Sequence, residues 1–410
     1  MTSVFPGLLA IGALGFLILW REGVFRQKTP LFLSALLLLA AMALRGLCME
    51  HETLDYQNFL ARWVDYFREN GGFRALKHSV GNYNVPYLYF LALFSYAGMR
   101  DLYLIKLLSV LFDVLLAWAV LRIVSRFHAG AGAKMAAFFL TLFLPTVVLN
   151  GACWGQCDSI YAAFGLWSIA FALEHKPVRA VAAIALSFAF KLQAVFLLPV
   201  FLIFLLSKSL KWYHLPVFPL VYFLTVLPAV LLGRPLWDTV TLYFNQADSV
   251  GSGVNYNSPS MYAFVQSAEN GAVLSAIGIA AAFVFLGLLY LLCALNRTRL
   301  NHHALLICSL LISVAVPFLL PHMHDRYFFL ADVLSLALAV AIPRLFFLPI
   351  FVSFASLTGY YAYLTGTWMF RTPASLRYGA CALLAVIAVL IAALLRSFSL
   401  NHQKRKRKTP

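Results

Sequence analysis

The sequence predicts an all-α protein that is built as a polytopic bundle of membrane-spanning helices. Of its 410 residues, 62% are hydrophobic and only 11% are charged, whereas a soluble domain is about half apolar and about a quarter charged. Apolar runs of about 15 to 25 residues recur along the whole chain, as bilayer-spanning helices require. We find no stretch that would fold as a soluble domain, and we expect a single transmembrane domain over residues 1–410.

About thirteen apolar segments qualify as spans, and an odd number places the N-terminus outside and the C-terminus inside. We predict them over residues 4–20, 30–47, 103–124, 135–150, 155–173, 179–192, 193–208, 215–232, 271–294, 303–320, 328–342, 345–363 and 378–396. The apolar segment 86–98 is short, and a full crossing there would turn Arg122 and Lys134 outward, so we expect it to be re-entrant or interfacial. The first run lacks a preceding basic segment, so we expect a retained span rather than a cleaved signal.

The net charge of +16 is divided unequally between the two sides. Successive spans place successive loops on opposite sides of the membrane. Counted in this way, the loops of one side contain 19 basic and two acidic residues, and those of the other side contain about 10 basic and 11 acidic residues. The positive-inside rule makes the first side cytoplasmic, together with the basic tail 397–410. We interpret this tail as a topology signal that contacts anionic lipids. Nucleic-acid binding is not expected.

Three polar segments are predicted on the external side. The first external loop, 48–85, contains aromatic and apolar residues at helical spacing, which predicts an amphipathic helix lying on the membrane. These residues are Tyr56, Phe59, Leu60, Trp63 and Phe67. The second external loop, 233–262, is rich in Asn, Ser and Gly and includes Asn257, and the third is the turn 321–327. We expect the second loop to help select the substrate.

Ionisable groups at membrane depth are costly and usually mark function or a wet cavity. Asp55 follows the second span, where a carboxylate that faces a cavity could act as a general base. An Asp is equally suited to cap the interfacial helix. Asp113 and Asp332 lie inside spans, and we expect them to pair within the bundle, for example with Arg45.

The turn PHMHDRYF is dense in polar groups, namely His322, His324, Asp325 and Arg326. Arg and protonated His suit a phosphate group near the bilayer surface, the HxHD spacing could suit a metal, and an ion-paired interfacial turn is the structural alternative. We favour phosphate or substrate binding and predict no metal or other cofactor. Lys191, beside Gln193, could extend to the lipid headgroups. It could also point into a cavity and donate a second set of hydrogen bonds to the phosphate, and we favour this second interpretation.

A polar helix start lies in NGACWGQCDSIY, where Trp154, Gln156 and Asp158 follow Asn150. A Trp, amides and a carboxylate are typical of sugar binding, although an aromatic belt and a helix cap would explain them too. The six cysteines are scattered, and we interpret them mainly as small apolar side chains. The CxxxC spacing of Cys153 and Cys157 lacks a second ligand pair, so we expect no metal there.

Five motifs in one order resemble the GT-C superfamily of membrane glycosyltransferases, most of all the enzymes that use dolichyl- or polyprenyl-phosphate-linked glucose or mannose. The likeness extends from Asp55 to Tyr327 over DYQxFxxxW, YNVPYLY, WGQCDSIY, FKLQAVFLLP and HMHDRYF. The family segment after the first loop usually has two prolines, and here only Pro86 is present.

The resemblance implies that Asp55 is the catalytic base and that the donor phosphate lies near the late His-acid-basic turn. Phosphate-binding residues would be His322, His324, Arg326 and Lys191, and substrate-binding residues Tyr56, Trp154, Gln156, Asp158, Gln193, Asn257 and Asp325. It further implies an inverting transfer of a hexose, such as mannose or glucose, from a polyprenyl-phosphate donor to a glycan or glycolipid acceptor. The site would face the periplasmic side of a bacterial inner membrane. A flippase for lipid-linked saccharides is the alternative function.

Overall fold

The computed structural model describes residues 4–25, 27–243, 253–265 and 270–406, without the side chains of 400–406. Apart from two strands of two residues each, the secondary structure in these ranges is helical. Seven helices are long and apolar enough to cross a membrane, or eight if one bent pair counts as a span, and six shorter helices are also apolar. This confirms a multi-pass bundle of membrane helices as the fold class.

The chain forms two compact units, which are described separately. The first unit comprises residues 1–171, 178–194 and 214–250. Its helices are α1 (Phe5–Arg21), α2 (Lys28–Leu47), η1 (Tyr56–Leu60), α3 (Ala61–Glu69), η2 (Gly72–Lys77), α4 (Val85–Phe94), α5 (Asp101–Val124), α6 (Ala131–Leu142), α7 (Pro145–Val148), η3 (Leu149–Trp154), α8 (Asp158–Leu173), α9 (Pro177–Phe190), α11 (Val217–Leu231) and α12 (Leu236–Val240).

The second unit comprises residues 172–177, 195–213 and 251–410. Its longer helices are α10 (Val200–Leu206), α14 (Gly271–Leu295), α15 (His302–Leu319), α16 (Phe329–Ala341), α17 (Leu348–Thr365) and α18 (Ala374–Lys406). Single turns complete it: η4 (Leu192–Phe196) at the junction of the units, η5 (Trp212–His214), η6 (Met261–Phe264), η7 (Arg297–Arg299), η8 (Pro343–Leu345) and η9 (Met369–Arg371). Helix α18 continues into the predicted tail 397–410, of which 407–410 lie outside the described residues.

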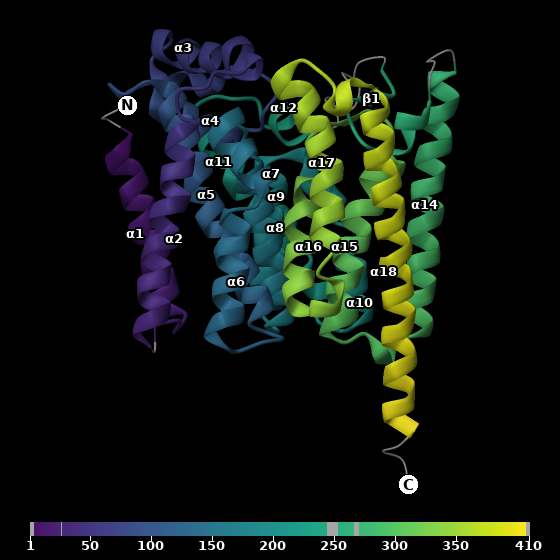
Figure 1. Ribbon diagram of the computed structural model, residues 1–410. Helices are drawn as coiled ribbons and strands as arrows, with labels where there is room; N and C mark the ends of the chain where they lie inside the picture. The colour runs from purple at the N-terminus through teal and green to yellow at the C-terminus, as the bar shows by residue number, and fades with distance from the viewer. Residues whose placement is uncertain (1–3, 26, 244–252, 266–269, 407–410) are drawn as a thin grey trace. The chain divides into compact units, whose positions relative to one another are not determined.

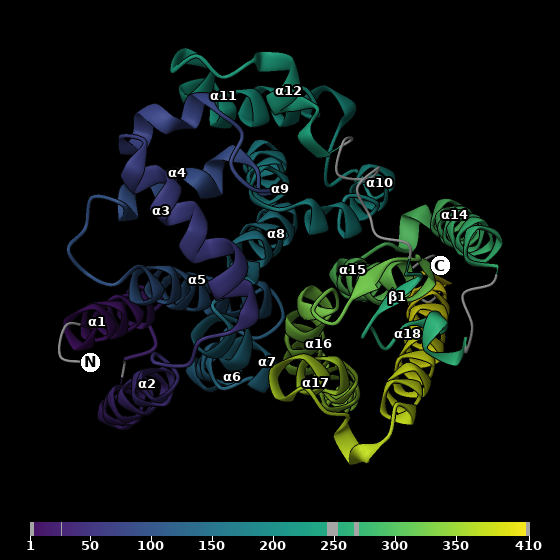
Figure 2. The same cartoon turned by 90° about the horizontal axis from the view of Figure 1, so that it is seen from above.

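In the first unit, α2, α5 and α6 run along a common direction, while α3 lies across their ends (Figures 1 and 2). The predicted amphipathic segment is therefore helical, but it begins as the π-helix η1 before it continues as α3. Its buried face is formed by Tyr56, Leu60, Val64 and Phe67. Phe59, which the sequence predicts on this face, is 50% exposed. The wider π turn rotates its side chain out of line with the buried residues of α3.

The stretch 48–100 begins and ends at the same end of the first unit. Arg100, which precedes α5, forms ion pairs with Glu50 and Glu52, which follow α2. Between them α4 has only ten residues, half of what a full crossing needs. The prediction that segment 86–98 does not cross is consistent with both observations.

Two features of the first unit depend on single residues. The predicted span 135–150 is instead a pair of helices, 131–142 and 145–154, bent by 47°, because Pro145 cannot donate to the preceding turn. The expected partner of Asp113 is confirmed as Arg45. Their buried side chains form an ion pair at 2.9 Å, which joins α2 to α5 in the core.

In the second unit, the second and third predicted external segments pair with one another. Strand β1 (Asn255–Tyr256) runs parallel to β2 (Met323–His324), and Asn257 bridges to His324. Helices α14 to α18 run side by side below this pair (Figures 1 and 2). Residues 244–252 of the second loop lie outside the described residues.

Candidate functional site

The first unit brings the sequence-predicted residues Asp55, Trp154 and Gln156 into direct contact. Oδ2 of Asp55 accepts hydrogen bonds from Nε1 of Trp154 at 2.9 Å and from Nε2 of Gln156 at 2.6 Å. Asp55 is half-buried, while Trp154 and Gln156 are buried. Within the described part of the chain, the Asp55 side chain makes no capping bond to the helix that follows, so its carboxylate is directed to the bundle instead.

Two π turns position this contact. Asp55 immediately precedes η1, and Trp154 is the last residue of η3. Such i→i+5 turns are rare and occur often at functional sites. Gly155 ends η3 with a φ of +81°, a conformation that glycine adopts at no steric cost, and the chain then reverses to present Gln156.

A chain of polar contacts continues from Gln156 to Lys191. The hydroxyl of Tyr83 donates to Oε1 of Gln156 at 3.3 Å, and Nζ of Lys191 lies 5.4 Å from the centre of the Tyr83 ring. Lys191 forms an ion pair with Asp158, with both side chains at most 3% exposed. Asn150 donates to the other oxygen of Asp158 at 2.8 Å. Lys191 therefore points into the unit and does not extend to the headgroups.

Two predicted residues have other surroundings. Tyr56 is buried, and its hydroxyl donates to Asp101 at 3.1 Å. Burial, together with the Asp101 charge, raises the pKa of Tyr56 to about 12, so this residue stays neutral and anchors η1 to α5. Gln193 has a buried Oε1 with no hydrogen-bond partner among the residues that the structure describes.

The second unit gathers the other predicted residues at β1 and β2. The His324 ring stacks on Tyr256 with 4.7 Å between ring centres and 12° between planes. Arg326 lies 3.7 Å from Asp325, and its side chain is 17% exposed. Asn257, which follows β1 and bridges to His324, has a φ of +58°. Arg326, His324 and Asn257 thus share one polar turn.

His322 belongs to the same turn, but its ring is already engaged. Its Nδ1 lies 2.7 Å from the carbonyl oxygen of Gly253 and its Nε2 lies 3.4 Å from Oγ of Ser275. Because a carbonyl oxygen only accepts, Nδ1 carries a proton. Across the described ranges, no group of three or more His, Cys, Asp or Glu side chains could hold a metal ion.

Sequence reasoning missed three residues of these two clusters. Tyr83 is part of the motif YNVPYLY and Tyr256 is part of the second external loop, but neither was predicted as a site residue, because aromatic residues are frequent at membrane boundaries. Lys106 is a cation in the interior of an apolar helix, and a charge at that depth is a signal of function.

Comparison with protein families finds no family model that matches this chain. A search of curated proteins likewise finds no match.

Proposed function

We propose that this protein is a membrane glycosyltransferase that moves a hexose from a polyprenyl-phosphate donor to an acceptor hydroxyl. The observation that carries the proposal is the carboxylate of Asp55, which accepts hydrogen bonds from two neutral N–H groups, those of Trp154 and Gln156. Tyr83 is hydrogen-bonded to the same Gln156. Positioned carboxylates of this kind serve as general bases. Aromatic and amide groups are the usual contacts of sugars. A lipid-linked substrate explains why the site belongs to a bundle of membrane helices.

In this mechanism Asp55 takes the proton of the acceptor hydroxyl while its oxygen attacks the anomeric carbon of the donor. The bond from that carbon to the phosphate oxygen breaks, so a single displacement inverts the anomeric configuration. The leaving phosphate gains negative charge, which Arg326 and His324 of the second unit are chemically suited to stabilise. That both units serve one reaction is part of this proposal.

Lys191 has a different role in the proposal from the one its sequence motif implied. Asp158 already neutralises its charge, so it offers less to a phosphate than an unpaired lysine would. We assign the Lys191–Asp158 pair to holding Tyr83, and through it Gln156, in place. Tyr83, which is partly exposed, would then contact the sugar of the acceptor or the donor, whereas Trp154 is fully buried and holds Asp55.

The proposal includes thirteen membrane crossings in the GT-C arrangement, with the N-terminus outside and the C-terminus inside. The seven long helices, the bent pair and all the shorter apolar helices except α4 supply that number. The sites would then face the external side of a bacterial inner membrane.

The decisive experiment measures sugar transfer by purified protein in detergent. Radiolabelled polyprenyl-phosphate mannose and polyprenyl-phosphate glucose serve as donors, and a membrane glycolipid extract serves as acceptor. We expect wild-type protein to move label into a product, and Asp55→Asn to be slower by about 10²-fold or more, as for a lost general base. Asp65→Asn is the matched control, because this Asp is exposed and pairs with Arg68.

Unchanged turnover in Asp55→Asn would remove Asp55 as the base. If wild-type protein forms no covalent product with either donor but moves labelled lipid across liposome bilayers, the flippase function replaces this proposal.

A further inference from the structure

A polar stripe on α5 contacts three segments near Asp55: the one that precedes it, the one that contains Gln156, and the start of α8. Lys106, Ser109 and Asp113 are spaced three and four positions apart, which places them on one face of the helix. Ser109 donates to the backbone oxygen of Gln156 at 2.7 Å. Asp113 accepts from Ser159, next to Asp158. Lys106 contacts the segment that precedes Asp55.

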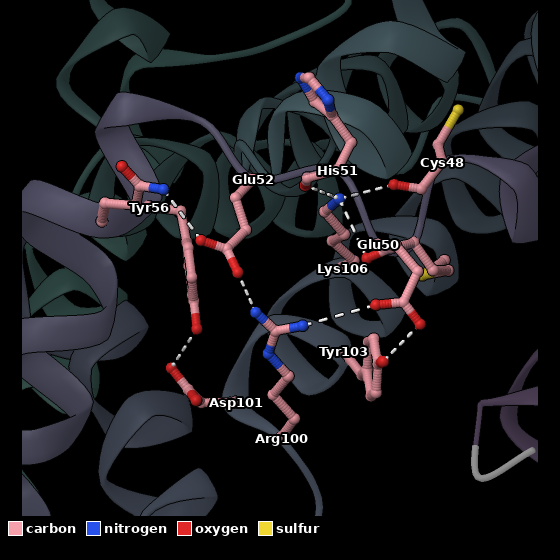
Figure 3. A network of polar contacts seen from close by, with 11 residues as sticks. Cys48, Glu50, His51, Glu52, Tyr56, Arg100, Asp101, Tyr103 and Lys106 are labelled. Atoms are coloured by element: carbon pink, nitrogen blue, oxygen red, sulfur yellow. Dashed lines mark hydrogen bonds and ion pairs between the residues drawn. The ribbon is translucent and has the colours of Figure 1, made fainter. Parts of the chain in front are cut away.

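Lys106 is fully buried, and its ammonium group is surrounded by backbone oxygens. Nζ donates to the carbonyl of Cys48 at 2.7 Å, of Met49 at 3.3 Å and of His51 at 2.6 Å. Figure 3 shows these carbonyls converging on the one nitrogen. A lysine has three donors, and here each has a backbone partner. Burying a cation is costly unless it is hydrogen-bonded in this way.

Other contacts also hold the segment from Cys48 to Asp55, among them the two hydrogen bonds that Asp55 accepts from Trp154 and Gln156. Thr53 donates to the backbone oxygen of Trp154 at 3.0 Å. At the surface, Arg100 pairs with Glu50 and Glu52 (Figure 3), but exposed pairs contribute little. The path of this segment therefore depends on several contacts, of which Lys106 supplies those to the carbonyls of Cys48, Met49 and His51. Because Asp55 continues this segment, these contacts also bear on the position of its carboxylate.

We propose that Lys106 is a positioning residue, whose buried ammonium gathers the carbonyls of residues 48, 49 and 51 and so fixes the segment that presents Asp55. The contact with Gly155 supports this assignment from a second direction. A Cβ atom on Gly155 would lie 3.9 Å from Cε and Cγ of Lys106, so the lysine also packs against the turn between Trp154 and Gln156. Its effect on turnover rests on the proposed function, whereas its effect on the segment does not.

The experiment compares hydrogen exchange and kinetics in Lys106→Met, which keeps the apolar stem but removes the three donors. We expect peptides that cover residues 48–56 to exchange at least tenfold faster, with peptides of α4 unchanged. We expect kcat to fall by about 10²-fold, as for a base displaced by about 1 Å, and KM for the donor to stay within about twofold, because Lys106 is buried and we assign it no contact with the donor.

The matched control is Lys134→Met. Lys134 also donates to a backbone oxygen, that of Glu22 at 2.7 Å, but it lies beside the C-terminal end of α1 instead of the Asp55 segment. Its replacement should leave both readouts at wild-type values. Lys106→Gln, which is neutral and keeps two donors, replaces Lys106→Met if that variant does not fold, and should accelerate exchange of the same peptides at least threefold.

Unchanged exchange of residues 48–56 in a folded Lys106 variant overturns the proposal. Faster exchange with unchanged kcat overturns the link to Asp55. If wild-type protein transfers no sugar, the proposed function fails, and the exchange data still decide whether Lys106 fixes the segment.

Discussion

At the scale of single residues, three carboxylates of the first unit differ in the partners that the structure gives them: the buried Asp113 and Asp158, and the half-buried Asp55. Asp113 and Asp158 are each paired with a cation, Arg45 and Lys191. The two bonds at Oδ2 of Asp55 come from neutral groups, Trp154 and Gln156. A carboxylate in a buried ion pair is committed to structure, and the proposed function assigns proton transfer to Asp55 instead.

The titration of the Cys48 thiol tests the contacts that the structure gives it with Cys153 and Lys106. A hydrogen bond with the Cys153 thiol lowers the pKa of Cys48 to about 6, and the charge of Lys106 contributes, although burial opposes the shift. Because the thiolate is the reactive form, its labelling by N-ethylmaleimide should rise through about pH 6 and level off above about pH 7. Mass spectrometry of the labelled peptide measures this.

The Cys153→Ala variant serves as the comparison, since it removes the first cause of the shift. Its labelling curve should move toward the ordinary cysteine pKa of about 8.5. A wild-type curve already centred near that value would contradict the described contact.

At the scale of elements, the hydropathy pattern predicted the helices well and their irregularities poorly. Apolar runs identify helices because burial in lipid requires them. The π turns η1 and η3 leave no such signal, since one additional residue per turn does not change composition. For the same reason the pattern predicted the polar residues near Asp55 but not their contacts, because Asp55 and Gln156 are 101 positions apart. Pro145 is the sequence signal for the bend of 47°, because proline interrupts the hydrogen bonds of a helix.

The close packing of α17 against the polar turn of the second unit can be tested at Gly359. A Cβ atom on Gly359 would lie 2.5 Å from the backbone oxygen of Asn257 and 3.0 Å from Cβ of Asp325. Gly359→Ala should therefore push the polar turn away from α17 and destabilise this unit by about 1–3 kcal/mol, as overpacking does. Thermal unfolding measures the loss. Gly287→Ala on α14 is the control, because nothing lies within 4 Å of its added Cβ; equal stability of the two variants would contradict this packing.

At the scale of the whole molecule, the candidate site residues that the structure describes form a polar cluster in each of the two units. In the first unit the cluster is built on a carboxylate, and in the second it includes Arg326 and His324. Such groups are costly in a membrane protein. The proposed function assigns the base to the first cluster and anion binding to the second.

The proposed topology can be tested with single cysteines in a cysteine-free variant and a membrane-impermeant maleimide. Leu54→Cys and Gly98→Cys should both react in intact cells, because the Arg100–Glu52 ion pair holds the two ends of the 48–100 stretch together. Leu54 is 65% exposed, and Gly98 has open space around it. Arg297→Cys, at the end of α14, should react only after permeabilisation, as the positive-inside rule requires. Labelling of Gly98→Cys only after permeabilisation would show that α4 crosses the membrane, and the basic loops after α5 would then face outward.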